Sequence, residues 1–152
     1  MYIPLELCYN TYMMRKTLLT AALAVATATT AIANAPTQLE RQFNDITASY
    51  DLDAKLYILT NEMRNANYPV LRGMPRNAIG FAAQVNGLEG QCLVFIDEEV
   101  AEKPLATSIL EHEIGHCLSW QKYGLNVRSH GNEWKSTCRE YATSFKSCQE
   151  RY

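Results

Sequence analysis

The 152-residue chain has little of several features that would identify its class at once. It contains only three histidines and five cysteines, and its lysines and arginines form no cluster. Because the formal net charge is −2, the sequence lacks the strongly basic character that is typical of nucleic-acid-binding proteins. No internal repeat and no low-complexity segment follows residue 35. Hydrophobic residues make up 47% and charged residues 20%, which predicts a globular chain of one-domain length.

The N-terminal part of the chain has the pattern of an export signal. Arg15 and Lys16 precede a long run of apolar and small residues without charge, and Ala33-Asn34-Ala35 fits a small-x-small cleavage site. A membrane anchor is the alternative, since the run is just long enough to span a bilayer. We predict cleavage, which makes the protein periplasmic or secreted, with no stable membrane anchor. The predicted division is 1–13 as an untranslated or non-functional extension, 14–35 as the signal peptide, and 36–152 as the folded domain.

Four cysteines remain after such a cleavage: Cys92, Cys117, Cys138 and Cys148. An even number of cysteines in a small exported protein favours disulfides. Sequence does not choose among the three possible pairings, but Cys138–Cys148 is the favoured one because it closes a short loop near the C-terminus. Cys92 and Cys117 fit equally well as buried thiols, because free cysteine packs as a small hydrophobic residue.

Hydrophobic spacing predicts two helices at the start of the domain, then two strands. The first helix begins at Pro36-Thr37, and the second covers Leu52 to Met63, where leucine or methionine recurs at i, i+4, i+7 and i+11. Residues 78–86 then alternate between apolar and small or polar, whereas residues 92–96 are continuously apolar. The Asn86-Gly87 pair between them predicts a hairpin.

Two further helices are expected after the strands. One begins near Pro104 and continues to Tyr123, where Gly124 is suited to end it. The last covers Asn132 to Phe145. The order helix, helix, hairpin, helix, helix predicts the α+β class, with a small antiparallel sheet (hairpin) packed against about four helices.

The stretch HEIGH, residues 112–116, lies within the first of these two helices. Residues four apart share a helix face, so His112 and His116 can bind one metal ion. Glu113 lies about 100° round from His112, where it can take a proton from a metal-activated water and pass it to a leaving amine. Zinc in a catalytic site has three protein ligands and one open position. An accidental pattern on a solvated helix and a closed structural zinc site are the alternatives.

The third ligand is not fixed by this spacing. The metzincin pattern HExxHxxGxxH fails, because Ser119 and Lys122 occupy its glycine and third histidine positions. His130 is the only other histidine in the chain. Glu133 and Glu140 are alternatives, since a glutamate from a following helix completes the site in thermolysin-like enzymes.

The stretch EHEIGHCLSWQKYG followed by SHGNEWK resembles the SprT-like zinc metalloprotease domain of the SprT/Spartan family. The resemblance implies a zincin-like fold, zinc (Zn2+) as the cofactor and Glu113 as the catalytic general base. The sequence departs from many members of that family, which carry a zinc ribbon with paired CxxC motifs. Here Cys138 and Cys148 do not have that spacing. The implied zinc ligands are His112, His116 and His130, and the further motif matches are Gly131, Trp134 and Lys135.

The sequence therefore predicts a zinc-dependent metalloendopeptidase that hydrolyses peptide bonds of a protein or peptide substrate. One alternative is a catalytically idle zinc-binding domain that acts by binding a partner protein. Another is a DNA-associated SprT-type protease in the cytoplasm, which requires that residues 14–35 do not act as a signal peptide. The charge gives no support to a nucleic-acid partner.

Other residues near the predicted site are weaker candidates. Trp120, one turn beyond HEIGH, either walls the cleft or belongs to the core. One of the strands, residues 78–86 or residues 91–96, is expected to lie along the cleft as an edge to which a peptide substrate adds. The candidates for stabilising an oxyanion are Tyr123, Arg128 and Tyr141.

Overall fold

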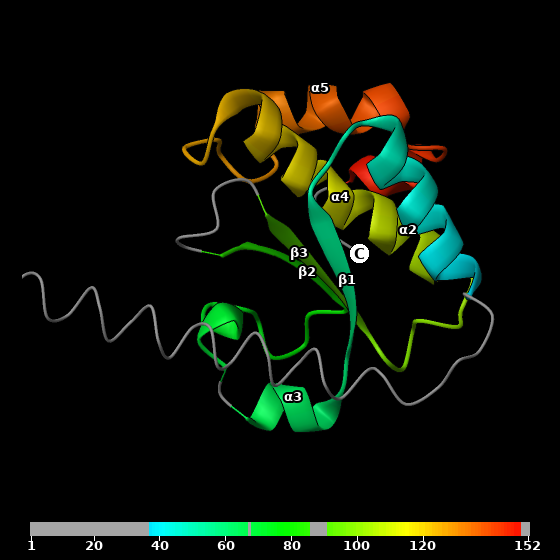
Figure 1. Cartoon of the computed structure of the whole chain (residues 1–152), viewed down its shortest axis with the longest axis vertical. Helices are drawn as coiled ribbons and strands as arrows, with labels where there is room; N and C mark the ends of the chain where they lie inside the picture. The colour runs from blue at the N-terminus through cyan, green and yellow to red at the C-terminus, as the bar shows by residue number, and fades with distance from the viewer. Residues whose placement is uncertain (1–36, 67, 86–90, 150–152) are drawn as a thin grey trace, which may run out of the picture. The chain divides into compact units, whose positions relative to one another are not determined.

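A computed structural model describes residues 37–66, 68–85 and 91–149, all within one compact unit, Pro36–Tyr152. These residues form a three-stranded mixed sheet and four α-helices (Figure 1), which confirms the predicted α+β class. The predicted signal peptide and the Asn86-Gly87 turn lie outside the described residues. Within the described ranges, none of the helices has the length and hydrophobicity that crossing a bilayer requires.

The order of elements follows the prediction except near the start of the domain. Thr37 caps the first helix by accepting a hydrogen bond from the backbone of Glu40, whose side chain accepts one in return from Thr37. In chain order the elements are α2 (Gln38–Ser49), β1 (Ala54–Leu59), α3 (Asn61–Asn65), η1 (Pro69–Leu71), β2 (Gly80–Gln84), β3 (Cys92–Asp97), α4 (Leu105–Tyr123), α5 (Asn132–Tyr141) and η2 (Phe145–Cys148).

The helix predicted over residues 52–63 is wrong. Half of this segment, Ala54–Leu59, is strand β1, which pairs in parallel with β3 along its whole length. The Tyr57 ring stacks on Phe95 with 5.3 Å between ring centroids, and Leu59 is fully buried on the same side of the sheet. Pairing with a strand far along the chain therefore outweighs the local helical spacing. It also makes the sheet mixed, whereas a purely antiparallel sheet was predicted.

Strand β3 is central, in the order β1-β3-β2, and β2 pairs with it in antiparallel fashion, as the two strands of the predicted hairpin should. Val94 and Ile96 pack into the cluster that joins the sheet to α2 and α4. Leu93 and Phe95 pack on the opposite face with Leu71 of η1. Burial on both faces explains why the sequence of β3 is continuously apolar.

Helix α4 is the element around which the others pack, with α2 and α5 beside it and β2 and β3 against it (Figure 1). Two disulfides fasten this arrangement. Cys138–Cys148 joins α5 to η2, which confirms the favoured pairing. Cys92–Cys117 joins the start of β3 to α4, so these two cysteines are not free thiols.

Candidate metal centre

The three histidines of the chain come together from α4 and from the loop that follows it. His112 and His116 lie one turn apart on α4, and both are buried. His130 has φ 58°, in the left-handed region that side chains with a Cβ atom rarely adopt. Next to it, a Cβ atom on Gly131 would lie 2.9 Å from the carbonyl oxygen of Arg128, so this close turn requires glycine. The turn directs the His130 ring back toward α4.

The imidazole Nε2 atoms converge on one point. Nε2 of His130 lies 2.9 Å from Nε2 of His112 and 3.1 Å from Nε2 of His116. Two ring N–H groups cannot face each other at this separation, so lone pairs point into the space between the rings, where a cation would bind them. Ligands of a tetrahedral zinc ion lie about 3.3 Å apart, given Zn–N distances of about 2.0–2.1 Å. The rings need to separate by only a few tenths of an ångström, so the residues fit a zinc ion.

The burial of these histidines sets their protonation state. Burial lowers the pKa of His112 to about 4, and the neighbouring His130 acts in the same direction. The pKa of His116 falls to about 3, again mainly through burial and further through the other two rings. Both rings are therefore neutral at pH 7 in the metal-free protein, and neutral imidazole is the form that binds a metal.

Glu113 lies between α4 and the sheet, next to β2. A Cβ atom on residue 80 would lie 2.7 Å from Glu113 Oε1, so the glycine there leaves room for the carboxyl group. Burial raises the pKa of Glu113 to about 8, and a hydrogen bond from the backbone of Ala82 acts in the opposite direction. A cation bound nearby would lower this pKa again. Glu113 is thus a buried carboxyl group directly next to a candidate metal ligand.

Trp134 of α5 lies against all three histidines. Its ring centroid is 4.8 Å from that of His112, 5.3 Å from that of His116 and 4.7 Å from that of His130. The indole is fully buried, and its Nε1 has no hydrogen-bond partner among the described residues. A Cβ atom on Gly115 would lie 3.0 Å from that nitrogen, so glycine at this position lets the indole approach α4. Trp134 therefore limits how far the rings can rotate.

The alternative ligands lie elsewhere. Glu140 is exposed and pairs with Lys122, with 3.0 Å between Nζ and Oε1, and Glu133 is also exposed. Among the described residues, the group that could hold a metal ion consists of the three histidines alone. Trp120 packs against the core, and its ring also lies 5.9 Å from that of His116. Of the oxyanion candidates, Tyr141 donates its hydroxyl hydrogen to the backbone oxygen of Glu111, whereas Tyr123 and Arg128 are exposed.

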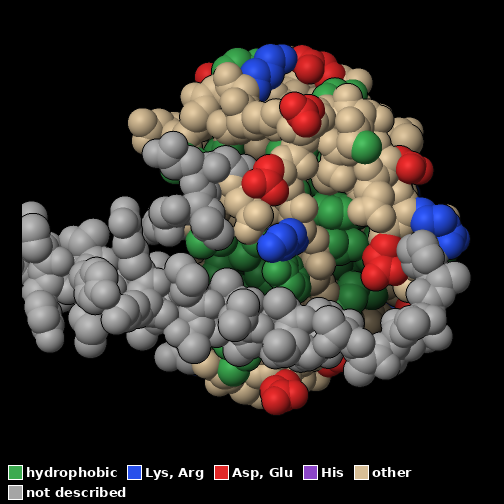
Figure 2. Space-filling model, in the orientation of Figure 1, with side chains coloured by type: hydrophobic (Ala, Val, Ile, Leu, Met, Phe, Trp, Pro, Cys, Tyr) green, Lys and Arg blue, Asp and Glu red, His purple; other side chains and the backbone are tan. Residues whose placement is uncertain are grey.

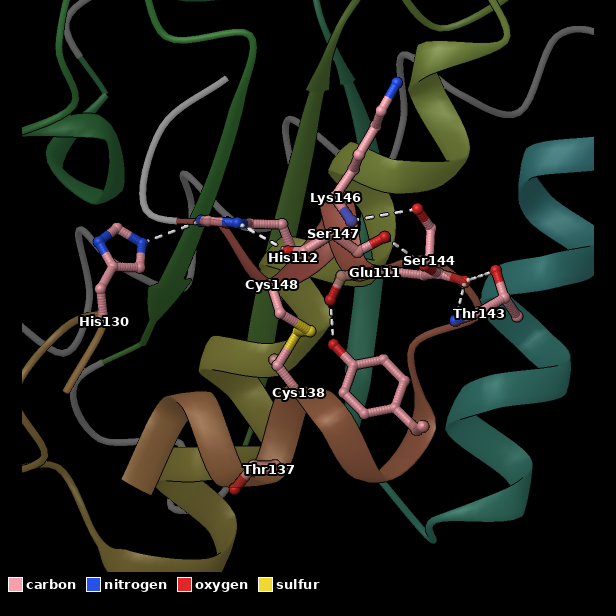
Figure 3. The surroundings of a disulfide bond; sticks show 12 residues. Glu111, His112, His130, Thr137, Cys138, Thr143, Ser144, Lys146, Ser147 and Cys148 are labelled. Carbon is pink, nitrogen blue, oxygen red and sulfur yellow. Dashed lines mark hydrogen bonds between the residues drawn. A yellow bond between two sulfur atoms is a disulfide. The ribbon is translucent and has the colours of Figure 1, made fainter. Parts of the chain in front are cut away.

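The structure adds one buried charged residue that the sequence patterns did not single out. Glu111 directly precedes His112 and is fully buried. Its carboxyl group binds the segment after α5 rather than the metal centre (Figure 3). Glu111 precedes the buried Ile114 and Leu118 by three and seven residues, which places it on the apolar face of α4, and this is a signal that sequence reasoning could have used. Its partners, more than 30 residues away, could not have been found in that way.

Fold and site together define an α+β domain with a candidate three-histidine metal centre beside a buried carboxyl group. The SprT-like family model matches residues 59–152, so the chain belongs to the SprT-like family. Family and histidine cluster together fit a zinc protease-like domain. No curated protein matches the chain, and no solved structure does. The zincin-like character of the fold stays a prediction.

Proposed function

We propose that this protein is a zinc-dependent metalloendopeptidase that acts outside the cytoplasm. The observation that carries the proposal is the convergence of three imidazole Nε2 atoms beside the buried Glu113. His112, His116 and His130 would hold the ion. Zinc bound there would supply a Lewis acid that polarises the substrate carbonyl and lowers the pKa of a water molecule.

Glu113 performs the proton transfers in this proposal. It accepts a proton from the attacking water and delivers it to the leaving amine. Burial raises the pKa of this carboxyl group and a cation bound nearby would lower it, so in the zinc-loaded protein the carboxylate can accept a proton around neutral pH. The same burial excludes bulk water that would otherwise compete for the proton.

Strand β2 is the proposed docking edge for the substrate backbone. The backbone oxygen of Ile79 accepts a hydrogen bond from the backbone nitrogen of Asp97. In an antiparallel pair the backbone N–H and C=O groups of successive residues point alternately toward and away from the partner strand. The backbone groups of residues 80, 82 and 84 therefore point away from β3. The hydrogen bond from Ala82 to Glu113 agrees with this direction. A peptide that adds to this edge as a further strand would place its backbone next to Glu113. The alternative prediction, that residues 91–96 form this edge, is wrong, because β3 is paired on both sides.

The disulfides support a periplasmic or secreted location, and the surface charge bears on the DNA-associated alternative. Both disulfides lie close to the candidate centre, and such bonds persist mainly in oxidising compartments. Acidic and basic side chains are scattered over the face drawn in Figure 2 instead of forming a patch of one sign. This distribution gives no support to the DNA-associated alternative.

The test compares zinc-loaded wild type with Glu113→Gln on an unfolded protein substrate. We expect the variant to keep its zinc and to lose about 100-fold or more in cleavage rate, because general acid–base catalysis contributes about 10²–10⁴-fold. Glu102→Gln, the same change at an exposed position before α4, is the control and should cleave normally. Equal activity of Glu113→Gln and wild type would contradict the mechanism. A wild type that holds zinc but cleaves nothing would favour the idle zinc-binding domain.

A further inference from the structure

The carboxyl group of Glu111 organises the segment that follows α5. Its Oε1 accepts hydrogen bonds from the Thr143 hydroxyl at 2.6 Å and from the Thr143 backbone nitrogen at 3.1 Å. Its Oε2 accepts one from the Ser147 hydroxyl at 2.5 Å (Figure 3). Both Glu111 and Ser147 are fully buried. A buried carboxyl group with donors on both oxygens strongly favours one position of this segment.

The segment held in this way contacts a candidate metal ligand. The Nδ1 atom of His112 lies 3.1 Å from the backbone oxygen of Ser147. A carbonyl oxygen can only accept, so Nδ1 must carry the proton of the neutral ring. The lone pair is then on Nε2, the atom that faces His130. Backbone hydrogen bonds with Ser147 and with Gln149, two residues further on in the same segment, thus select the tautomer of His112 that a metal ion needs.

Two covalent or polar links fasten the same segment to its surroundings. The disulfide Cys138–Cys148 ties the residue after Ser147 to α5. Tyr141, at the end of α5, donates its hydroxyl hydrogen to the backbone oxygen of Glu111. Figure 3 shows Glu111 between Ser147 and Thr143, with the disulfide beside them. The Ser147 carbonyl is therefore held in place from both directions along the chain.

We propose that Glu111 is a positioning residue of the metal centre, acting through Ser147 on His112. This role rests on the proposed function, because it assumes that His112 binds a metal ion. The contacts among Glu111, Ser147 and His112 do not depend on that assumption. Without the hydrogen bond between Glu111 and Ser147, the Ser147 carbonyl is less well fixed, and His112 exchanges between its two neutral tautomers. Nε2 then carries a proton part of the time, which opposes metal binding. Changing the group that orients a ligating histidine lowers metal affinity by about 10–100-fold.

Two substitutions separate this role from general packing. Ser147→Ala removes one hydroxyl group and leaves the carbonyl that contacts His112. Glu111→Gln keeps the size of the side chain and replaces one acceptor oxygen with a donor. The matched control is Ser144→Ala in the same segment, because the Ser144 hydroxyl accepts a hydrogen bond from the backbone of Lys146 instead of binding Glu111.

The first readout is the protonation of the His112 ring in the metal-free, oxidised protein, measured from the ring 15N chemical shifts. The chain has three histidines, so the spectrum is simple if the protein carries no polyhistidine tag. Wild type and Ser144→Ala should show His112 as a single Nδ1–H tautomer, whereas Ser147→Ala and Glu111→Gln should show a mixture. The second readout is zinc affinity by competition with a chelator, which should fall about 10-fold in the same two variants.

The outcomes are distinguishable. A wild-type His112 protonated on Nε2, or a folded Ser147→Ala protein with the wild-type tautomer and zinc affinity, would overturn the proposal. If Glu111→Gln does not fold, Ser147→Ala decides alone. If wild type binds no zinc while His112 loses its single tautomer in Ser147→Ala, the positioning role stands and the proposed enzymatic function fails.

Discussion

The contact between β2 and α4 depends on the absence of a side chain at Gly80. A Cβ atom there would lie 2.4 Å from Cγ2 of Ile109 and 2.7 Å from Oε1 of Glu113. Ile109 is fully buried and Glu113 nearly so, and neither has free space to move into. The Gly80→Ala substitution should therefore push β2 away from α4 or displace the carboxyl group.

The expected loss of stability follows from two opposing effects. Overpacking a close-packed core costs about 1–3 kcal/mol. Replacing glycine by alanine inside a strand stabilises the fold by about 0.5–1 kcal/mol, because the unfolded chain then loses less conformational entropy on folding. From the middle of each range, the net destabilisation is about 1 kcal/mol, visible as a lower urea midpoint at unchanged slope. Zinc content should stay at the wild-type level, because no histidine is touched, whereas cleavage activity should fall with the displacement of Glu113.

Two further variants make the test specific. Gly73→Ala is the control, because nothing lies within 4 Å of its added Cβ atom, although its φ of 90° makes alanine strained there. It should lose stability but keep its activity. Gly80→Ala combined with Ile109→Ala should be less destabilised than the sum of the two single variants, since the second change removes the clashing methyl group. Wild-type stability and activity in Gly80→Ala would refute the placement of β2 against Glu113.

Three other predictions concern the fastening of the site and the N-terminus. Replacing both Cys138 and Cys148 by alanine should destabilise the protein by about 3 kcal/mol, measured by thermal unfolding, because the bond spans a sequence separation of 10; an unchanged midpoint would contradict this. Gly115→Ala should not show the gain of about 1 kcal/mol that alanine normally brings inside a helix, because its Cβ atom would press on Trp134; a gain of that size would mean that the indole lies elsewhere. The exported protein should begin after Ala35 by intact mass, and an uncleaved precursor outside the cytoplasm would rule out the predicted cleavage.

The sequence was sufficient where the signal is local. The HEIGH spacing places two imidazoles on one helix face whatever the rest of the fold does, and the structure has that helix from Leu105 to Tyr123. The scarcity of histidine left His130 as the one remaining imidazole. The structure brings it to the other two, and its left-handed conformation before Gly131 is a detail that spacing alone could not supply.

The sequence was insufficient where distant parts of the chain decide the outcome. The leucines between residues 52 and 63 fit a helix, but the segment pairs with β3, more than 30 residues later. The last helix was predicted to reach Phe145 and ends at Tyr141. The chain after it turns to place Thr143 and Ser147 against Glu111, which competes with further helix formation. Local periodicity contains no information on such partners.

Zinc stoichiometry of the purified, oxidised protein, measured beside His130→Ala and Glu133→Ala, decides whether the three histidines form a metal centre. We expect about one zinc ion per chain in wild type and in Glu133→Ala, and little or none in His130→Ala. Loss of zinc in Glu133→Ala with retention in His130→Ala would replace the third ligand by a glutamate. A folded wild-type protein that binds no zinc would mean that the three converging histidines do not form a metal centre.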